Sequence, residues 1–341
     1  MGDAPILLVD DEPLNLDALR NVLGDERRLV YARNGVEALA AVRRHVPALV
    51  LMDVRMPEMD GYAACEALKA DPQTAAIPVI FVTSLSDDLD EARGFEVGAV
   101  DYITRPFAPL LVRARVRTHL SLVRASLLER SYDEAIFMLG RAGHYNDNDT
   151  GVHVWRMAAY ARELARAVGW AERDCRNLEL AAPMHDTGKI GIPSEILRKP
   201  AKLDADEWVV MKTHTRIGHN ILSHSQAPVF QLAAEVALRH HEQWDGSGYP
   251  DGLAGEAIPI AARIVAVADV FDALTMKRPY KNAWPVEDAI AQLERGAGRH
   301  FDPRLIEAFG TALPRVLVIK AEWDAREARW QSGGALPAPG L

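Results

Sequence analysis

Polar residues in the first third of the chain stand directly after short apolar runs: Asp10, Asp11, Asp53, Thr83 and Arg105. Each of them alone is more simply explained as a side chain in a solvated loop. Carboxylates that gather in one pocket repel one another, and a divalent cation such as Mg²⁺ relieves the repulsion through its preference for oxygen ligands. Asp53 could then act as a nucleophile and form an aspartyl phosphate, with the cation neutralising the phosphoryl group.

A second set of residues recurs along the other half of the chain: His153, His185, Asp186, His214, His240, His241 and Asp269. On successive helices of a bundle, such side chains can meet in the core. Mixed imidazole and carboxylate ligands suit Fe, Mn, Ni or Zn, and a pair of such ions is the usual arrangement for phosphoester hydrolysis. Lys189, three residues after Asp186, could place positive charge on a phosphate oxygen.

A single histidine on an apolar helix face is more often a core residue than a metal ligand. The apolar positions of 229–237 continue in phase to His240, however, and His241 follows at once. At least one of these two imidazoles is therefore expected to point inward.

The elements that must position the first set alternate between two kinds. Apolar runs at 6–9, 29–32, 48–52, 79–82 and 102–103 predict strands, and amphipathic stretches near 13–23, 35–45, 60–70 and 86–98 predict helices. This alternation predicts an α/β, doubly wound parallel sheet of flavodoxin-like type, which binds ligands at the carboxyl ends of its strands. All members of the first set follow strands and can converge there.

The remainder of the chain is predicted to be all α. Residues 108–141 read as nearly continuous helix, and the apolar period stays helical to about residue 325. We therefore expect four parts: a phosphoacceptor domain at 1–120, a helical linker at 121–139, a helical metal-binding domain at 140–325, and a loose tail at 326–341.

Composition excludes several classes of function. The chain has 341 residues and a net charge of −9, which makes DNA or RNA a poor partner. Cys65 and Cys175 lack metal-binding spacing and are typical of buried thiols in a reducing compartment. We find neither a signal peptide nor an apolar run long enough to insert into a membrane, and we expect a cytoplasmic protein.

Residues 1–120 resemble a response-regulator receiver domain. The resemblance is carried by Leu-Val-Asp-Asp-Glu (8–12), Met-Asp-Val-Arg-Met-Pro (52–57) and Asp-Tyr-Ile-Thr-Arg-Pro-Phe (101–107). It implies Asp53 as the phosphoacceptor for a sensor histidine kinase, Asp10 and Asp11 as Mg²⁺ ligands, Thr83 as a phosphoryl-binding hydroxyl and Tyr102 as the switch aromatic. The family has Lys where this chain has Arg105, which replaces a flexible ammonium with a planar fork.

Residues 140–325 resemble an HD-GYP phosphodiesterase domain. The segments that carry this resemblance are His-Asp-Thr-Gly-Lys-Ile-Gly-Ile-Pro (185–193), Gly-Tyr-Pro (248–250), Val-Ala-Asp-Val-Phe-Asp-Ala-Leu-Thr (267–275) and Arg-Pro-Tyr-Lys (278–281). It implies hydrolysis of cyclic di-GMP to the linear dinucleotide or GMP at two or three ions, for which we expect iron or manganese. His185, Asp186 and Lys189 are the implied catalytic residues.

The same resemblance assigns further residues. It implies that the seven histidines and aspartates of the second set are metal ligands. It also implies that Lys189, Arg278 and Lys281 contact phosphates of the substrate and that Tyr249 lines the guanine or phosphate side. Some family members have a Glu ligand four residues before the first His. Asp149 stands there, either as a ligand or as a helix N-cap. Asp272, one helical turn from Asp269, is a candidate partner of a ligand.

Other functions compete with the leading hypothesis of a cyclic di-GMP phosphodiesterase controlled by Asp53. A degenerate relative that only binds nucleotide or partner proteins would usually have lost ligands, and this chain retains them. Another cyclic dinucleotide as substrate is left open by the sequence. A DNA-binding regulator is disfavoured by the charge and by the missing helix-turn-helix. A homodimer formed through the linker helix is a further candidate.

Overall fold

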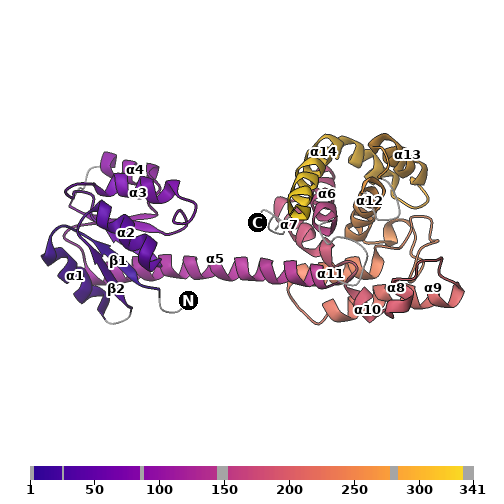
Figure 1. Ribbon diagram of the computed structural model, residues 1–341, viewed down its shortest axis with the longest axis horizontal. Helices are drawn as coiled ribbons and strands as arrows, with labels where there is room; N and C mark the ends of the chain where they lie inside the picture. The colour runs from indigo at the N-terminus through magenta and orange to yellow at the C-terminus, as the bar shows by residue number, and fades with distance from the viewer. Residues whose placement is uncertain (1–3, 25–26, 85–87, 144–152, 277–282, 333–341) are drawn as a thin grey trace. The chain divides into compact units, whose positions relative to one another are not determined.

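The computed structural model describes residues 4–24, 27–84, 88–143, 153–276 and 283–332, without the side chains of 88–91 and 331. The chain divides into two compact units, Met1–Glu129 and Arg130–Leu341. Helix α5 (Pro109–Gly143) contributes to both (Figure 1).

The first unit is built on a parallel sheet with strand order β2-β1-β3-β4-β5. Its strands are β1 (Ile6–Val9), β2 (Leu29–Ala32), β3 (Leu49–Met52), β4 (Val79–Thr83) and β5 (Asp101–Thr104), which confirms the predicted strands and fold class. The register aligns Val9 with Met52, so the residues that follow, Asp10 and Asp53, leave neighbouring strands at the same level. The predicted convergence at the strand ends follows from this register.

Helices cover both faces of this sheet: α1 (Pro13–Leu23), α2 (Gly35–His45), α3 (Gly61–Ala70), α4 (Asp88–Glu96) and the start of α5 (Figure 1). Alternate residues of a strand point to opposite faces. Ile6 and Leu8 accordingly pack with apolar residues of α1 and α5, whereas Leu7 and Val9 pack with those of α2 and α3. Both faces are apolar, as a parallel sheet between two helical layers requires.

Within its described residues, the second unit is built of helices joined by loops, with two isolated β-bridges and no strand. Its helices are α6 (His153–Ala167), α7 (Glu172–Ala181), η2 (Ala182–Met184), η3 (Thr187–Gly191), α8 (Ser194–Leu197), α9 (Ala205–Lys212), α10 (His214–Leu222), α11 (Pro228–Arg239), η4 (Gly255–Ala257), α12 (Ile260–Thr275), α13 (Val286–Gly296) and α14 (Pro303–Gln331). Helix α6 is central, because its apolar positions Val154, Met157, Ala161 and Leu164 are fully buried among residues of α7, α12 and α14.

Helix α5 is the predicted long helix. Val112, Val116 and Leu120 of its first half are buried in the core of the first unit, and Ile136 of its second half is buried in the core of the other. Residues 121–131 between them are almost entirely exposed. None of the helices within the described ranges combines the length and apolar character needed to cross a bilayer.

Candidate metal centre and phosphoacceptor site

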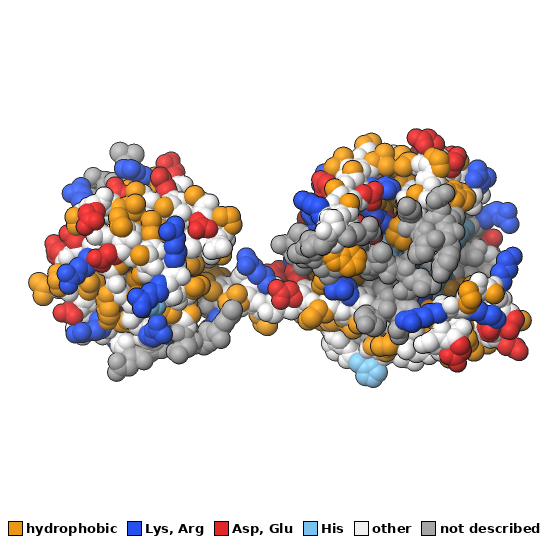
Figure 2. Space-filling view, in the orientation of Figure 1, with side chains coloured by type: hydrophobic (Ala, Val, Ile, Leu, Met, Phe, Trp, Pro, Cys, Tyr) orange, Lys and Arg blue, Asp and Glu red, His pale blue; other side chains and the backbone are white. Residues whose placement is uncertain are grey.

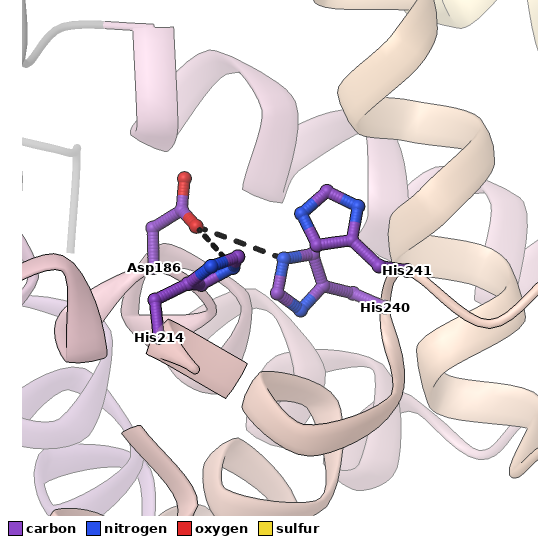
Figure 3. Close-up of side chains that lie close together, drawn as sticks. All are labelled: Asp186, His214, His240 and His241. Atoms are coloured by element: carbon purple, nitrogen blue, oxygen red, sulfur yellow. Dashed lines mark ion pairs between the residues drawn. The ribbon is translucent and has the colours of Figure 1, made fainter. Parts of the chain in front are cut away.

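A cluster of four side chains lies inside the second unit. Ligand atoms of Asp186, His214, His240 and His241 all lie within 4.8 Å of one another. Asp186 stands between η2 and η3, His214 begins α10, and the two adjacent histidines directly follow α11. Figure 3 shows the carboxylate pointing toward His214 and His240, with the His241 ring beside that of His240.

The backbone fixes the orientation of the imidazoles. Nδ1 of His185, His214 and His240 lies 2.8, 2.7 and 3.0 Å from carbonyl oxygens of Ala182, Met211 and Val236. A carbonyl oxygen only accepts, so each Nδ1–H donates and Nε2 is turned the other way. Histidines that bind metals usually have their second ring nitrogen tied in this manner.

The atoms that face one another across the cluster leave room for a cation. Asp186 Oδ1 lies 3.4 Å from His214 Nε2 and 3.6 Å from His240 Nε2. These three atoms are buried, and none has a hydrogen-bond partner among the described residues. Ligand atoms about 2.0–2.2 Å from one ion lie roughly 3–3.5 Å apart around it. The donor set and its spacing therefore fit a transition-metal ion.

Electrostatics in the cluster favour metal ligation at neutral pH. Burial lowers the pKa of His214 to about 4 and that of His241 well below its usual range, so both rings are neutral. Burial alone would raise the pKa of Asp186, but Lys189 and His185 more than offset it and hold this pKa well below its ordinary value. A carboxylate and neutral imidazoles are the forms that bind metal ions.

His185 and His153 lie at the border of the cluster. His185 Nε2 is 3.2 Å from Asp186 Oδ2. Burial lowers the pKa of His185, but the Asp186 carboxylate outweighs burial and raises this pKa to about 9, with a smaller contribution from Asp269. His153 Nδ1 lies 3.7 Å from Asp272 Oδ2, as expected if Asp272 supports a ligand. His153, His185 and Asp269 are not part of the four-residue group.

The remaining residues predicted for this site fall into two groups. Lys189 Nζ lies 2.7 Å from Asp186 Oδ2, and the Tyr249 ring stacks on His241 with centroids 4.7 Å apart. Asp149, Arg278 and Lys281 lie outside the described residues.

Gly188 explains how Asp186 approaches His214. A Cβ atom added at Gly188 would lie 1.8 Å from the His214 carbonyl oxygen and 2.4 Å from the Gly218 nitrogen. Only glycine allows the backbone after Asp186 to lie directly against α10, because every other residue carries a Cβ. The glycine in the sequence His-Asp-Thr-Gly therefore has a packing role in the site.

The other predicted site lies at the carboxyl edge of the sheet in the first unit. Carboxylate oxygens of Asp10, Asp11 and Asp53 lie within 4.8 Å of one another, a grouping that fits the oxygen-only donor set of Mg²⁺. Burial raises the pKa of Asp53, while Arg105 and a hydrogen bond from Thr83 act in the opposite direction. Tyr102 is buried, with its ring 6.5 Å from that of Phe81.

Arg105 lies within this carboxylate group. Its Nη2 contacts Asp10 Oδ2, donates to the Val82 carbonyl at 2.7 Å, and lies 3.8 Å from Asp53 Oδ1. Its guanidinium therefore offsets part of the repulsion between the carboxylates. All three contacts involve the single nitrogen Nη2, so they depend on the positive charge at this place and not on the two-point geometry of the guanidinium.

Comparison with known proteins follows the same division of the chain. A family model described as a response regulator receiver domain matches residues 6–117, and one described as an HD domain matches residues 130–305. The chain is 40% identical over 346 residues to the cyclic di-GMP phosphodiesterase response regulator RpfG of Xanthomonas campestris pv. campestris, covering 95% of this chain and 92% of that protein. This chain belongs to the HD-GYP family of response regulators.

Two Vibrio cholerae proteins are also similar to this HD-GYP response regulator. A probable cyclic di-GMP phosphodiesterase is 39% identical over 342 residues, covering 91% of this chain and 78% of that protein. A 3′3′-cGAMP-specific phosphodiesterase 2 is 46% identical over 194 residues, covering 57% of this chain and 37% of that protein.

Sequence reasoning missed two buried charged residues of this HD-GYP response regulator. Arg156, 1% exposed, pairs with Asp272 behind His153. Glu242 is also buried and accepts backbone N–H groups of Asp251 and Leu253, each at 3.0 Å, which holds the loop that carries Tyr249. The position of Glu242 directly after the paired histidines was the available signal. The signal for Arg156 in the sequence was weaker: an arginine on an otherwise apolar helix face requires a buried partner.

Proposed function

We propose that this HD-GYP response regulator hydrolyses cyclic di-GMP to pGpG, GMP or both, at the cluster around Asp186, under control of phosphorylation at Asp53. The observation that carries the proposal is the convergence of His214 Nε2 and His240 Nε2 on Asp186 Oδ1, three atoms that make no hydrogen bond within the described part of the chain. Buried polar atoms left without partners cost free energy, which a bound cation recovers.

Residues of the cluster would hold two or three transition-metal ions, for which iron or manganese suits mixed nitrogen and oxygen ligands. The ligands we propose are Asp186, His214, His240, His241, His185, Asp269 and His153, with Asp149 as an added candidate. Such ions, when bound, lower the pKa of water and offset charge on the phosphodiester.

The chain's own residues would orient the substrate. Lys189 already lies beside Asp186 and can share its charge with a phosphate oxygen. The half-buried Tyr249, whose ring stacks on His241, would line the guanine or phosphate side of the substrate at the edge of the cluster. Arg278 and Lys281 are proposed as further phosphate contacts.

Control by phosphorylation is part of the proposal. A sensor histidine kinase would phosphorylate Asp53, with Mg²⁺ held by Asp10 and Asp11 and the phosphoryl group contacted by Thr83 and Arg105. Tyr102, as the switch aromatic, would change its contacts with neighbouring side chains when Asp53 is phosphorylated. Helix α5 is the covalent route to the second unit, since it contributes buried residues to both cores.

A homodimer formed through α5 and a cytoplasmic location complete the proposal. Leu122 and Leu128 are 59% and 72% exposed in the 121–131 segment, where a second copy could cover them. Cys65 and Cys175 are free thiols, as is usual in a reducing compartment.

A second candidate substrate is 3′3′-cGAMP. The observation that favours it is the similarity of the second unit to the 3′3′-cGAMP-specific Vibrio cholerae protein. The two substrates differ in one purine, so base contacts must discriminate between them.

The test is a direct assay of hydrolysis. Purified protein is incubated with cyclic di-GMP, or with 3′3′-cGAMP, in the presence of Mn²⁺ or Fe²⁺, and products are separated by chromatography. We expect cyclic di-GMP to be consumed faster, with pGpG or GMP as product. If 3′3′-cGAMP were consumed faster, it would replace cyclic di-GMP as the proposed substrate. If neither were consumed, both proposals would be rejected.

A further inference from the structure

A concave site distinct from both predicted sites lies in the first unit. It is a cavity of about 370 Å³ between the end of α1 and one face of α5. Ile6, the first residue of β1, lines it, whereas Asp10 follows the last residue of that strand. The cavity is thus at the end of the sheet opposite the phosphoacceptor.

Arginines surround this cavity. Its lining includes Arg27, Arg113, Arg117 and Arg124, and no aspartate or glutamate among the described residues contributes to it. Arg113 is held in place, because its Nε donates to the Val22 carbonyl at 2.5 Å. Arg117 and Arg124 make no hydrogen bond or ion pair with the described part of the chain. Their guanidinium groups therefore remain available to an anion.

The floor of the cavity is apolar, with Leu23 from α1 and Val116 and Leu120 from α5. All three belong to the buried core on that side of the sheet. Ligand pockets typically combine such a floor with a few convergent polar groups and have volumes of about 300–1,000 Å³. The volume of the cavity lies in this range, and its lining joins the apolar floor to a group of arginines.

A solvated helix face is the simpler explanation for surface arginines, but it does not account for this arrangement. Arg113, Arg117 and Arg124 are spaced by four and seven residues, so they fall on one face of α5 together with Leu120. The chain as a whole has a net charge of −9, so the positive charge of these arginines is confined to this part of the molecule. It surrounds a hollow, which a flat solvated face would not form.

We propose that this cavity, named here the arginine pocket, binds a small organic phosphate of nucleotide size. Guanidinium forks match phosphate oxygens in charge and in two-point geometry. The apolar floor would take the flat base or the sugar. A nucleic-acid polymer fits less well because the acidic remainder of the chain repels its backbone.

The position of the arginine pocket gives the ligand a regulatory effect. Ser121 and Arg124 line it just beyond Leu120, the last α5 residue buried in the first unit. A phosphate that contacts Arg27 and Arg124 together would tie the connection between α1 and β2 to the exposed start of the 121–131 segment. Binding here does not depend on the metal centre and is separate from the proposed hydrolysis.

The test is calorimetric titration of the full chain with guanosine 5′-diphosphate, in EDTA to suppress metal-bridged binding elsewhere. Guanosine and pyrophosphate are titrated separately. Arg117→Ala/Arg124→Ala is compared with Arg43→Ala/Arg44→Ala, which removes equal charge from exposed positions on α2. Exposed substitutions of this kind change stability little, and circular dichroism verifies the fold of both.

We expect the diphosphate to bind wild type more tightly than guanosine or pyrophosphate does, and Arg117→Ala/Arg124→Ala to weaken binding about tenfold or more. The control variant should change it less than about twofold. Equal weakening in both variants, or pyrophosphate binding as well as the diphosphate, would overturn the proposal. So would binding to phosphatidylserine vesicles without binding of the diphosphate.

Discussion

Arg156 and Asp272 form a two-point ion pair inside the second unit, with Nε–Oδ1 at 2.6 Å and Nη2–Oδ2 at 3.2 Å. Both side chains are 1% exposed. The pair joins α6 to α12, and Asp272 Oδ2 lies 3.7 Å from His153 Nδ1. Asp272 thus lies between a buried cation and a proposed metal ligand.

Arg156→Met should destabilise the second unit by about 3–5 kcal/mol, because it leaves a buried carboxylate without its partner. Arg162→Met is the control, since Arg162 is partly exposed and its ion pairs contribute about 1 kcal/mol or less. Urea unfolding measures both free energies. Similar losses in the two variants would contradict a special role for the buried pair.

Gly188→Ala should disrupt the metal centre, because the new Cβ would lie 1.8 Å from the His214 carbonyl oxygen and must push α10 away from Asp186. We expect a loss of activity together with lower stability. Gly310→Ala is the matched control: Gly310 is exposed in α14 with no atom within 4 Å of an added Cβ. That change should stabilise the protein by about 0.5–1 kcal/mol. Normal activity and metal content in Gly188→Ala would refute the packing argument.

The parts of this architecture that follow from local pattern were predictable. Apolar runs ended by Asp10 and Asp53 predicted both strands and their shared edge, and the helical phase of 229–237 predicted that at least one of His240 and His241 points inward. These predictions needed only the periodicity of the apolar residues and the geometry of parallel strands.

Other features depend on contacts between distant segments. Arg156 and Asp272 are separated by 116 positions, and no local rule connects them. The donation of imidazole Nδ1–H groups to carbonyls of the preceding turn depends on rotamers rather than on residue type. Gly188 could be recognised as a flexible residue, but its contact with α10 required the tertiary structure.

Arg105→Ala should raise the pKa of Asp53, because the guanidinium is the main group that opposes the effect of burial there. A higher pKa leaves less ionised nucleophile at a given pH, so phosphorylation by a small phosphodonor should slow, most at lower pH. Arg105→Lys keeps the charge and should preserve most of the rate. NMR titration of Asp53 and phosphorylation kinetics measure the two effects. An unchanged Asp53 pKa in Arg105→Ala would show that the position is passive.

The most direct measurement of the central claim is metal content together with cyclic di-GMP hydrolysis in Asp186→Asn, compared with His224→Ala. Asp186→Asn keeps the side-chain volume and removes the charge that faces His214 and His240. His224 is exposed and outside the cluster. We predict that Asp186→Asn loses bound iron or manganese and all hydrolysis while Asp53 still accepts phosphate, and that His224→Ala matches wild type. Turnover by Asp186→Asn near the wild-type rate, with metal retained, would contradict the assignment of this cluster as the catalytic centre.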